Sequence, residues 1–153
     1  MSPSEAALTT VESFFTSYRS AFERGDIAAI EEHFADGVHV ASDTGSGVHV
    51  QFVPRADWRR VIGQLVSQYQ ALDVATAEMR SLQVTSVSDR LVQAHVSWAL
   101  SSRRGSLIYE FAAAYTLACE GQRCRIVAVA HDEIAQARRA PRRDQETADR
   151  ERS

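Results

Sequence analysis

Apolar residues recur at helical spacing near the beginning of the chain. They fall at i, i+3, i+4, i+7 and i+11, occupied by Val11, Phe14, Phe15, Tyr18 and Phe22. Residues at this spacing share one face of a helix, so the pattern predicts an amphipathic helix whose apolar stripe packs against a core.

Polar residues and glycine mark where this helix begins and ends. Thr9 and Glu12 fit a capping box at its start, and Gly25 fits the left-handed position at its end. Asp26 follows as the N-cap of a second, shorter helix. The second helix turns three apolar residues toward the same core: Ile27, Ile30 and Phe34.

Alternation of apolar and polar residues then replaces the helical period, which predicts two short strands joined by a three-residue hairpin loop within residues 42–46. Pairing about this loop sets Val40 opposite Val48 and His39 opposite His49. The valines then share one face and the histidines the other. Two imidazoles without a third ligand are a weak metal signal, so we expect no metal.

A third helix follows Pro54, and four strand-like runs follow the helix at hairpin spacing. The helix carries its apolar residues on one face: Trp58, Val61, Ile62, Leu65, Val66 and Tyr69. The runs cover about residues 74–87, 91–102, 106–118 and 124–132. The apolar parity changes between Met79 and Leu82, as a bulge would cause, and bulges bend long strands. We therefore expect a strongly curved sheet.

The 153 residues are most simply one domain, because a chain of this length buries roughly two-thirds of its unfolded surface. We assign this domain to residues 1–135. Residues 136–153 are rich in charges of both signs and have no hydrophobic period, which predicts a disordered tail or a short solvated helix. The expected core includes Phe14, Phe22, Ile30, Phe34, Val61, Leu65, Val96, Phe111 and Leu117.

Charge and composition exclude several classes of partner. The net charge is −3, from 17 basic and 20 acidic residues, so no sustained basic surface exists for nucleic acid. No window reaches the ~18 apolar residues of a membrane span, and the amino terminus does not resemble a signal peptide. We therefore predict a cytoplasmic protein without a membrane partner. All the basic residues are arginine and asparagine is absent, which indicates a GC-rich bacterial genome.

The two cysteines, Cys119 and Cys124, flank four residues that can form a hairpin turn. This spacing could place both thiols opposite each other on adjacent strands. Two cysteines cannot complete a structural zinc site alone. We predict free, partly buried thiols.

Two segments carry a family resemblance that spans roughly residues 8–133. The first reads YRSAFERGDIAAIEEHFADGVHV and is similar to ketosteroid isomerases and SnoaL-like polyketide cyclases. The second reads SLIYEFAAAYTLACEGQRCRIVAVAHDE and looks like their last two strands. The chain thus resembles the nuclear transport factor two-like superfamily. This implies an α+β fold in which three amino-terminal helices cover a cone-shaped, curved antiparallel sheet around a pocket.

The resemblance to ketosteroid isomerases carries over only in part. Those enzymes use a tyrosine in the first helix, which Tyr18 matches, together with a basic and a protonated aspartate. Ser42 occupies the position of the base and Ala113 that of the protonated acid. Ordinary ketosteroid isomerase activity is therefore disfavoured.

An acid/base cluster ends the last predicted strand. His131 can accept and return a proton near neutral pH, and the adjacent Asp132 could orient it. Period two sends His131 and Glu133 to one side and Asp132 to the other. Our candidate catalytic residues are Tyr18, His131 and Asp132. The competing interpretations are a core tyrosine and a solvated end of the strand.

A curved sheet under helices leaves a concavity, and an apolar cavity with a few polar groups is the usual small-molecule site. An aromatic stripe is also what a plain core contains. The candidate substrate-binding residues are Phe14, Ser42, Trp58, Tyr109, Phe111 and Tyr115. We expect a hydrophobic ligand and no cofactor.

Two functions remain open, because a fold alone does not determine function. The first is a small-molecule-binding domain acting as an acid/base cyclase, isomerase or dehydratase on a polyketide-like or cyclic carbonyl compound. The second is a non-catalytic dimeric accessory module, which the missing acids at Ser42 and Ala113 favour. In either case we predict a homodimer through the outer sheet face, with Val92, Ala94, Ala112 and Ala114 pointing outward.

Overall fold

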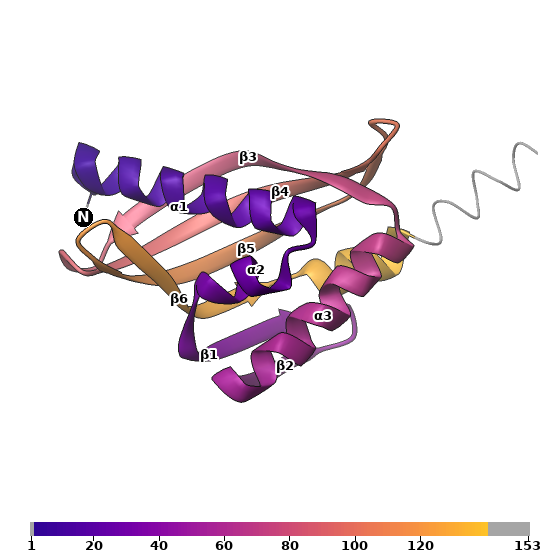
Figure 1. Ribbon diagram of the computed structural model, residues 1–153, viewed down its shortest axis with the longest axis horizontal. Helices are drawn as coiled ribbons and strands as arrows, with labels where there is room; N and C mark the ends of the chain where they lie inside the picture. The colour runs from indigo at the N-terminus through magenta and orange to yellow at the C-terminus, as the bar shows by residue number, and fades with distance from the viewer. Residues whose placement is uncertain (1, 141–153) are drawn as a thin grey trace, which may run out of the picture.

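The computed structural model describes residues 2–140, which form an α+β fold (Figure 1). The elements in chain order are α1 (Glu5–Arg24), α2 (Ile27–Glu32), β1 (Phe34–Asp43), β2 (Val48–Pro54), α3 (Arg55–Ala71), β3 (Val74–Ser86), β4 (Leu91–Ser102), β5 (Leu107–Glu120) and β6 (Arg123–His131). A further helix covers 133–140. No helix within the described range is long and apolar enough to cross a membrane.

The six strands form one curved sheet in the order β2-β1-β6-β5-β4-β3. Neighbouring strands are antiparallel except β1 and β6, which run parallel. Helices α1, α2 and α3 lie across one face of the sheet (Figure 1). The pairing of β3 with β4 shifts register between Met79 and Ser81, which confirms the predicted bulge.

The caps of the first two helices are partly as predicted. Ser4 caps α1 by accepting a hydrogen bond from the Ala7 N–H at 3.1 Å, and the Thr9 hydroxyl donates to the Glu5 carbonyl. The predicted Thr9 capping box is therefore wrong, because the earlier Ser4 lets the helix begin at Glu5. Gly25 ends α1 with φ 63°, and Asp26 caps α2 through the Ala29 N–H, as predicted.

The β1–β2 register differs from the predicted one. His39 lies opposite Phe52, and Ser42 lies opposite His49. The Asp43 carboxylate accepts a hydrogen bond from the Gly45 N–H at 2.9 Å, and the Thr44 hydroxyl donates one to the Gly47 carbonyl. These bonds between side chains and backbone extend the turn to residues 44–47. The predicted pairing of His39 with His49 is therefore wrong.

This register places Val48 and Val50 of β2 on the outer face of the sheet. Val48 is 71% exposed and Val50 is 67% exposed, whereas Val38 and Val40 are buried beneath the helices. Residues Val92 and Ala94 are also buried, so their predicted outward orientation is wrong, while Ala112 is exposed as predicted. The alternation in β4 runs in the opposite phase, because Gln93, His95 and Ser97 face outward.

The core lies between the helices and the concave face of the sheet. Of the nine predicted core residues, five are buried: Phe14, Ile30, Phe34, Val96 and Leu117. The other four are half-buried and line a cavity: Phe22, Val61, Leu65 and Phe111.

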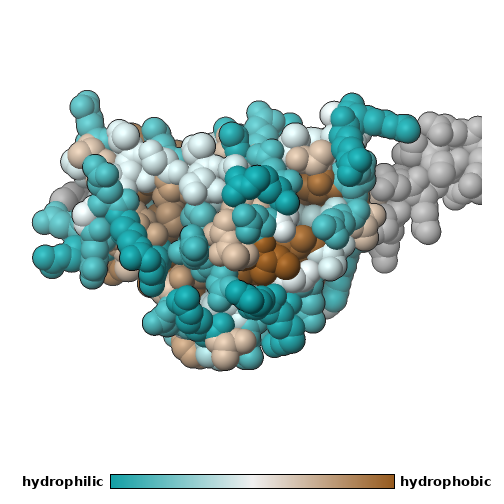
Figure 2. Space-filling view, in the orientation of Figure 1, coloured by the Kyte–Doolittle hydropathy of each residue, from teal (hydrophilic) through white to brown (hydrophobic). Residues whose placement is uncertain are grey.

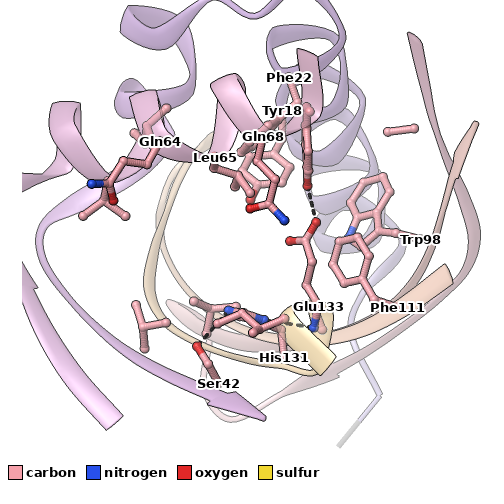
Figure 3. A pocket seen from close by; sticks show the side chains of 18 of the residues that line it. Tyr18, Phe22, Ser42, Gln64, Leu65, Gln68, Trp98, Phe111, His131 and Glu133 are labelled. Carbon is pink, nitrogen blue, oxygen red and sulfur yellow. Dashed lines mark hydrogen bonds between the residues drawn. The ribbon is translucent and has the colours of Figure 1, made fainter. Parts of the chain in front are cut away.

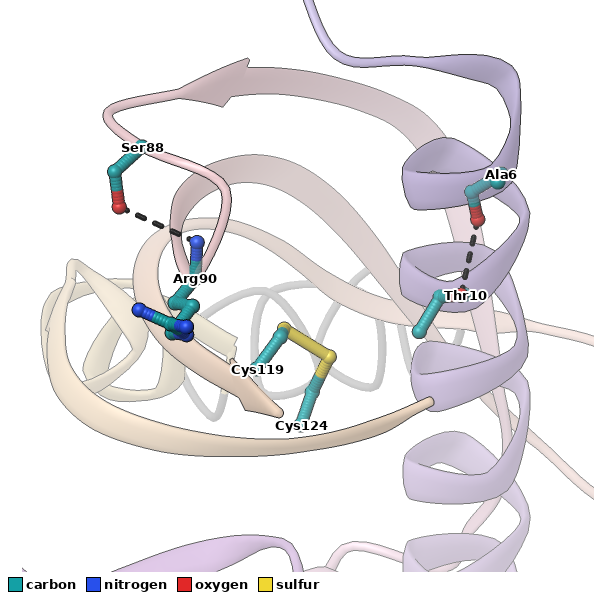
Figure 4. Close-up of a disulfide and its surroundings, with 6 residues drawn as sticks. All are labelled: Ala6, Thr10, Ser88, Arg90, Cys119 and Cys124. Carbon is teal, nitrogen blue, oxygen red and sulfur yellow. Dashed lines mark hydrogen bonds between the residues drawn. A yellow bond between two sulfur atoms is a disulfide. The ribbon is translucent and has the colours of Figure 1, made fainter. Parts of the chain in front are cut away.

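A disulfide joins Cys119 to Cys124 across the β5–β6 hairpin (Figure 4). The two residues are directly opposite in the ladder, and Gly121 adopts φ 63° in the turn between them. The prediction of free thiols is therefore wrong, because the hairpin register brings both sulfur atoms together.

The helix over 133–140 packs against the β1–β2 loop. Ala135 and Ala137 are buried, and the Arg138 guanidinium donates to the Thr44 carbonyl at 2.7 Å. This helix includes the first residues of the predicted tail. The rest of that tail, residues 141–153, lies outside the described residues.

Candidate active site

A cavity of about 280 Å³ lies between the concave face of the sheet and the helices α1 and α3 (Figure 3). Apolar atoms gather between these helices on the face drawn in Figure 2, surrounded by polar residues. The aromatic side chains that line this cavity come from both helices and strands: Tyr18, Phe22, Phe34, Trp58, Tyr69, Trp98, Phe111 and Tyr115. The size and lining suit a small apolar ligand, since ligand pockets begin near about 300 Å³.

Glu133 is the buried acid of this cavity. It lies directly after β6, at the start of the helix over 133–140, and is 9% exposed. Its Oε2 accepts hydrogen bonds from the hydroxyls of Tyr69 and Tyr109. Burial raises the pKa of Glu133 to about 7, and the two tyrosine hydrogen bonds oppose that rise. The carboxyl group is therefore able to take up and release a proton near neutral pH.

The tyrosines around Glu133 remain neutral donors. Burial raises the pKa of Tyr69 well above its ordinary value, and the nearby Glu133 carboxylate raises it further. Burial and the same carboxylate also raise the pKa of Tyr109. Both phenols therefore hold Glu133 in place without competing with it for proton transfer.

His131 lies at the end of β6, beside Ser42 of the parallel strand β1. The Nδ1 atom of His131 accepts from the backbone N–H of Glu133 at 3.2 Å, so its ring proton resides on Nε2. That Nε2–H donates to the Ser42 Oγ at 3.1 Å. Burial lowers the pKa of His131, with Asp132 acting in the opposite direction. The imidazole is thus held neutral, in one tautomer, facing the cavity (Figure 3).

Tyr18 reaches the cavity from α1. Its ring packs at 5.9 Å from Tyr115 and 6.2 Å from Trp98, measured between ring centroids. Burial raises the pKa of Tyr18, and the neighbouring phenol of Tyr115 adds to that rise. Tyr115 itself accepts from the indole N–H of Trp98 at 3.0 Å. Tyr18 is therefore a neutral hydroxyl on the wall of the cavity that also holds His131.

Not all the predicted site residues meet in this cavity. Tyr18, His131, Ser42, Trp58, Phe111 and Tyr115 line it, whereas Phe14 and Tyr109 are not among its lining residues. Tyr109 contributes only by its hydrogen bond to Glu133. The Asp132 carboxylate accepts from the Ala112 N–H at 2.8 Å and from the Gln136 side chain at 3.2 Å. Asp132 therefore does not orient His131.

Sequence reasoning undervalued Glu133. Period two placed it on the same side as His131, yet charged residues at the end of a strand are usually solvated. Its contacts come from Tyr69, 64 residues away, and Tyr109, 24 residues away. No local pattern marks either tyrosine as a partner of Glu133. The one signal in the sequence was strand alternation, which placed Glu133 on the same side of the strand as His131.

Within residues 2–140, no group of three histidine, cysteine, aspartate or glutamate side chains could hold a metal ion. The described residues bring one carboxyl group, one imidazole and several hydroxyl groups to the cavity wall.

A family model described as "NTF2-like protein (DUF6841)" matches residues 5–134. The chain belongs to this NTF2-like family. The match covers nearly all of the described residues, from the start of α1 to the residue after Glu133.

Solved structures of NTF2-like and cystatin-like folds resemble the chain. A protein of unknown function with a cystatin-like fold from Nostoc punctiforme superposes with a TM-score of 0.67 at 6% identity, over 86% of this chain and 94% of that one. An NTF2-like "putative dehydratase" from Streptomyces avermitilis gives 0.59 at 14% identity, over 81% and 93%. A "putative calcium/calmodulin dependent protein kinase II association domain" from Xanthomonas campestris gives 0.62 at 10% identity, over 86% and 91%.

Because the sequence identities to these solved structures are low, the similarities show only that this chain shares their fold. A comparison with curated proteins finds no match.

Proposed function

We propose that this protein binds an apolar small molecule in the cavity and transfers protons on it, as a cyclase, isomerase or dehydratase acting on a polyketide-like or cyclic carbonyl compound. The observation that carries the proposal is Glu133, a buried carboxyl with a pKa of about 7 that faces an aromatic cavity. Groups with such pKa values are well suited to general acid/base work. The likeness to the Streptomyces avermitilis protein adds support for this class of reaction.

The proposed reaction begins at a carbon next to the carbonyl group of the substrate. Ionised Glu133 takes the proton from that carbon, and the electron pair of the C–H bond moves through to the carbonyl oxygen. A neutral donor must stabilise the oxyanion that forms, and the Tyr18 hydroxyl on the cavity wall is the proposed donor. In a β,γ-unsaturated substrate Glu133 then returns the proton to the γ carbon, and the carbonyl re-forms with the double bond moved, which gives isomerisation. In a β-hydroxy substrate Glu133 gives the proton to the β-hydroxyl group, which leaves as water with the electron pair of its C–O bond while the carbonyl re-forms, and this gives dehydration.

The base can be tested before the natural substrate is known. Nitrobenzisoxazole is an uncharged aromatic probe that loses a carbon-bound proton to a base as its N–O bond breaks, and it releases a coloured phenolate. We expect the protein to accelerate this reaction with a rate that rises through about pH 7, where Glu133 ionises. The Glu133→Gln variant should lower the rate by about 10²-fold or more.

Two further variants sharpen the test. Tyr18→Phe should lower turnover of a carbonyl substrate by roughly 10²–10³-fold, the scale of losing one oxyanion donor. Glu12→Gln removes an exposed carboxylate of α1 that is not among the cavity residues, and should leave the rate unchanged. A wild-type protein without acceleration, or a Glu133→Gln variant as fast as wild type, would refute the proposal.

The second candidate is a non-catalytic dimeric accessory module. It is favoured by the apolar residues that β2 exposes on the outer sheet face, Val48, Val50 and Phe52. The likeness to an association domain from Xanthomonas campestris supports the same idea. Under this alternative the protein forms a homodimer through the outer face, and the cavity serves only as part of the core.

A further inference from the structure

Once Glu133 is ionised, the charge inside the cavity is negative, and residues 2–140 place no unpaired cation beside it. Glu133 is the only acid among the described residues that line it, and Arg19 is the only permanent cation. The Arg19 Nε lies 3.3 Å from the Glu23 carboxylate, and 41% of the Arg19 side chain is exposed. Arg19 is therefore a paired group at the rim and does not neutralise Glu133.

The groups that face Glu133 from each packed element do not supply a positive charge either. They are Tyr18 of α1, Tyr69 of α3, Tyr109 and Tyr115 of β5, and His131 of β6. The tyrosines are neutral, and burial favours the neutral form of the imidazole. The adjacent Asp132 is a second acid, and it opposes the ionisation of Glu133.

A ligand carboxylate in this cavity would place a second negative charge near the first one. Two like charges repel more strongly in a buried site than in water, because the surroundings screen them less. The uncharged polar side chains of the cavity wall include three glutamines: Gln51, Gln64 and Gln68. Amides can donate hydrogen bonds to a neutral carbonyl group, but they carry no charge to offset an anion.

We propose that the cavity selects ligands by charge, accepting uncharged aromatic or alicyclic carbonyl compounds and rejecting carboxylates while Glu133 is ionised. This inference deepens the proposed function and rests on it, since it names the substrate class of the same site. It concerns binding alone, so unreactive probes can test it.

The probes are naphthamide and naphthoate, which have nearly the same shape and differ in charge. At about pH 8.5 we expect naphthamide to bind at least about tenfold more tightly, which corresponds to one unit of pKa coupling with Glu133. At about pH 6 Glu133 is mostly protonated while naphthoate is still ionised, so the difference should shrink. Titration calorimetry in two buffers of different ionisation enthalpy should show proton uptake with naphthoate and none with naphthamide.

Matched variants assign the effect to one carboxylate. Glu133→Gln should strengthen naphthoate binding by about tenfold at about pH 8.5 and change naphthamide binding by less than about twofold. Glu12→Gln changes the net charge equally and should alter neither affinity. Proton uptake by the wild-type protein keeps the inference testable if Glu133→Gln does not fold.

Several results would overturn the inference. Equal affinities for the two probes at about pH 8.5 would refute charge selection, and so would an affinity ratio that Glu133→Gln leaves unchanged. In both cases the loss of nitrobenzisoxazole turnover in Glu133→Gln would still support the proposed function. If neither probe binds at any pH, the cavity is not a ligand site and both proposals fail.

Discussion

Burial determines how Glu133 titrates, and the two tyrosine hydroxyls only moderate its effect. A carboxylate without a cation nearby is stabilised poorly in an apolar cavity, so its protonated form persists to higher pH. The same physical cause makes His131 neutral, because burial disfavours the charged form of an imidazole as well. The site therefore holds an acid, Glu133, and a base, His131, and burial favours the uncharged form of both.

Glu133 should make the stability of the protein depend on pH in an unusual direction. The folded carboxyl keeps its proton up to about pH 7, whereas the unfolded one loses it near 4.5. The free energy of unfolding should therefore fall as pH rises through this window, by about 3 kcal/mol in total. Denaturant unfolding of wild type and Glu133→Gln at several pH values would measure the difference.

His131 contributes with the opposite sign. Its folded pKa is lowered, so the unfolded state binds the proton first, and stability falls as the pH is lowered below about 6.5. The Glu133→Gln variant should retain this acidic limb and lose the decline toward neutral pH. A decline of equal size in wild type and variant would show that Glu133 is not the group responsible.

At the scale of elements, the β5–β6 hairpin is closed twice, by its backbone ladder and by the disulfide between Cys119 and Cys124 (Figure 4). The disulfide lies at the turn end of β6, whereas His131 lies at the other end of the same strand. The disulfide therefore links the two strands of the hairpin at the end that lies away from the candidate site. Disulfides persist in oxidising compartments, so this bond weighs against the predicted cytoplasmic location, which stays a prediction.

Loss of the disulfide should lower the free energy of unfolding by about 2 kcal/mol, as expected for closing a loop of about six residues. Reductant should destabilise the wild-type protein by this amount. The matched control is the double variant Cys119→Ser/Cys124→Ser, whose stability reductant should not change. Two free thiols in the native, unreduced protein would contradict this expectation.

Helices α1, α2 and α3 lie on one face of the sheet (Figure 1), and no helix of residues 2–140 is placed over the exposed residues of its outer face. The exposed face carries small residues of β5, such as Ala112, and the apolar residues of β2. Val50 and Phe52 are 67% and 57% exposed, which is unusual for large apolar side chains on a polar protein surface. A second copy of the chain is the simplest cover for such a face.

We expect the protein to sediment as a dimer at micromolar concentration. Ala112→Arg should make it a monomer, because it would place two symmetry-related charges in an interface that must bury about 1,200 Å² or more to be stable. The control is Ala28→Arg, which adds the same side chain to an exposed position of α2 on the opposite side of the sheet. A wild-type protein that sediments only as a monomer would refute the dimer.

Local patterns along the chain were enough to predict the elements and much of their orientation. The stripe that includes Phe15 and Tyr18, the N-cap at Asp26, the glycine at position 25 and the bulge near Met79 all follow from local spacing or local hydrogen bonds. The family resemblance then predicted how these elements are arranged in the fold. Period two also placed His131 and Glu133 on the same side. Such features are readable because a few neighbouring residues determine them.

The way in which distant residues come together depends on the packing of the whole chain, which no local pattern shows. Parallel pairing of β1 with β6 brings Ser42 to His131 across 89 residues, and packing of α3 over the sheet places Tyr69 on Glu133. The β1–β2 register and the disulfide depend on loop geometry, which alternation does not specify. The raised pKa of Glu133 follows from burial, and burial is a property of the whole packed chain.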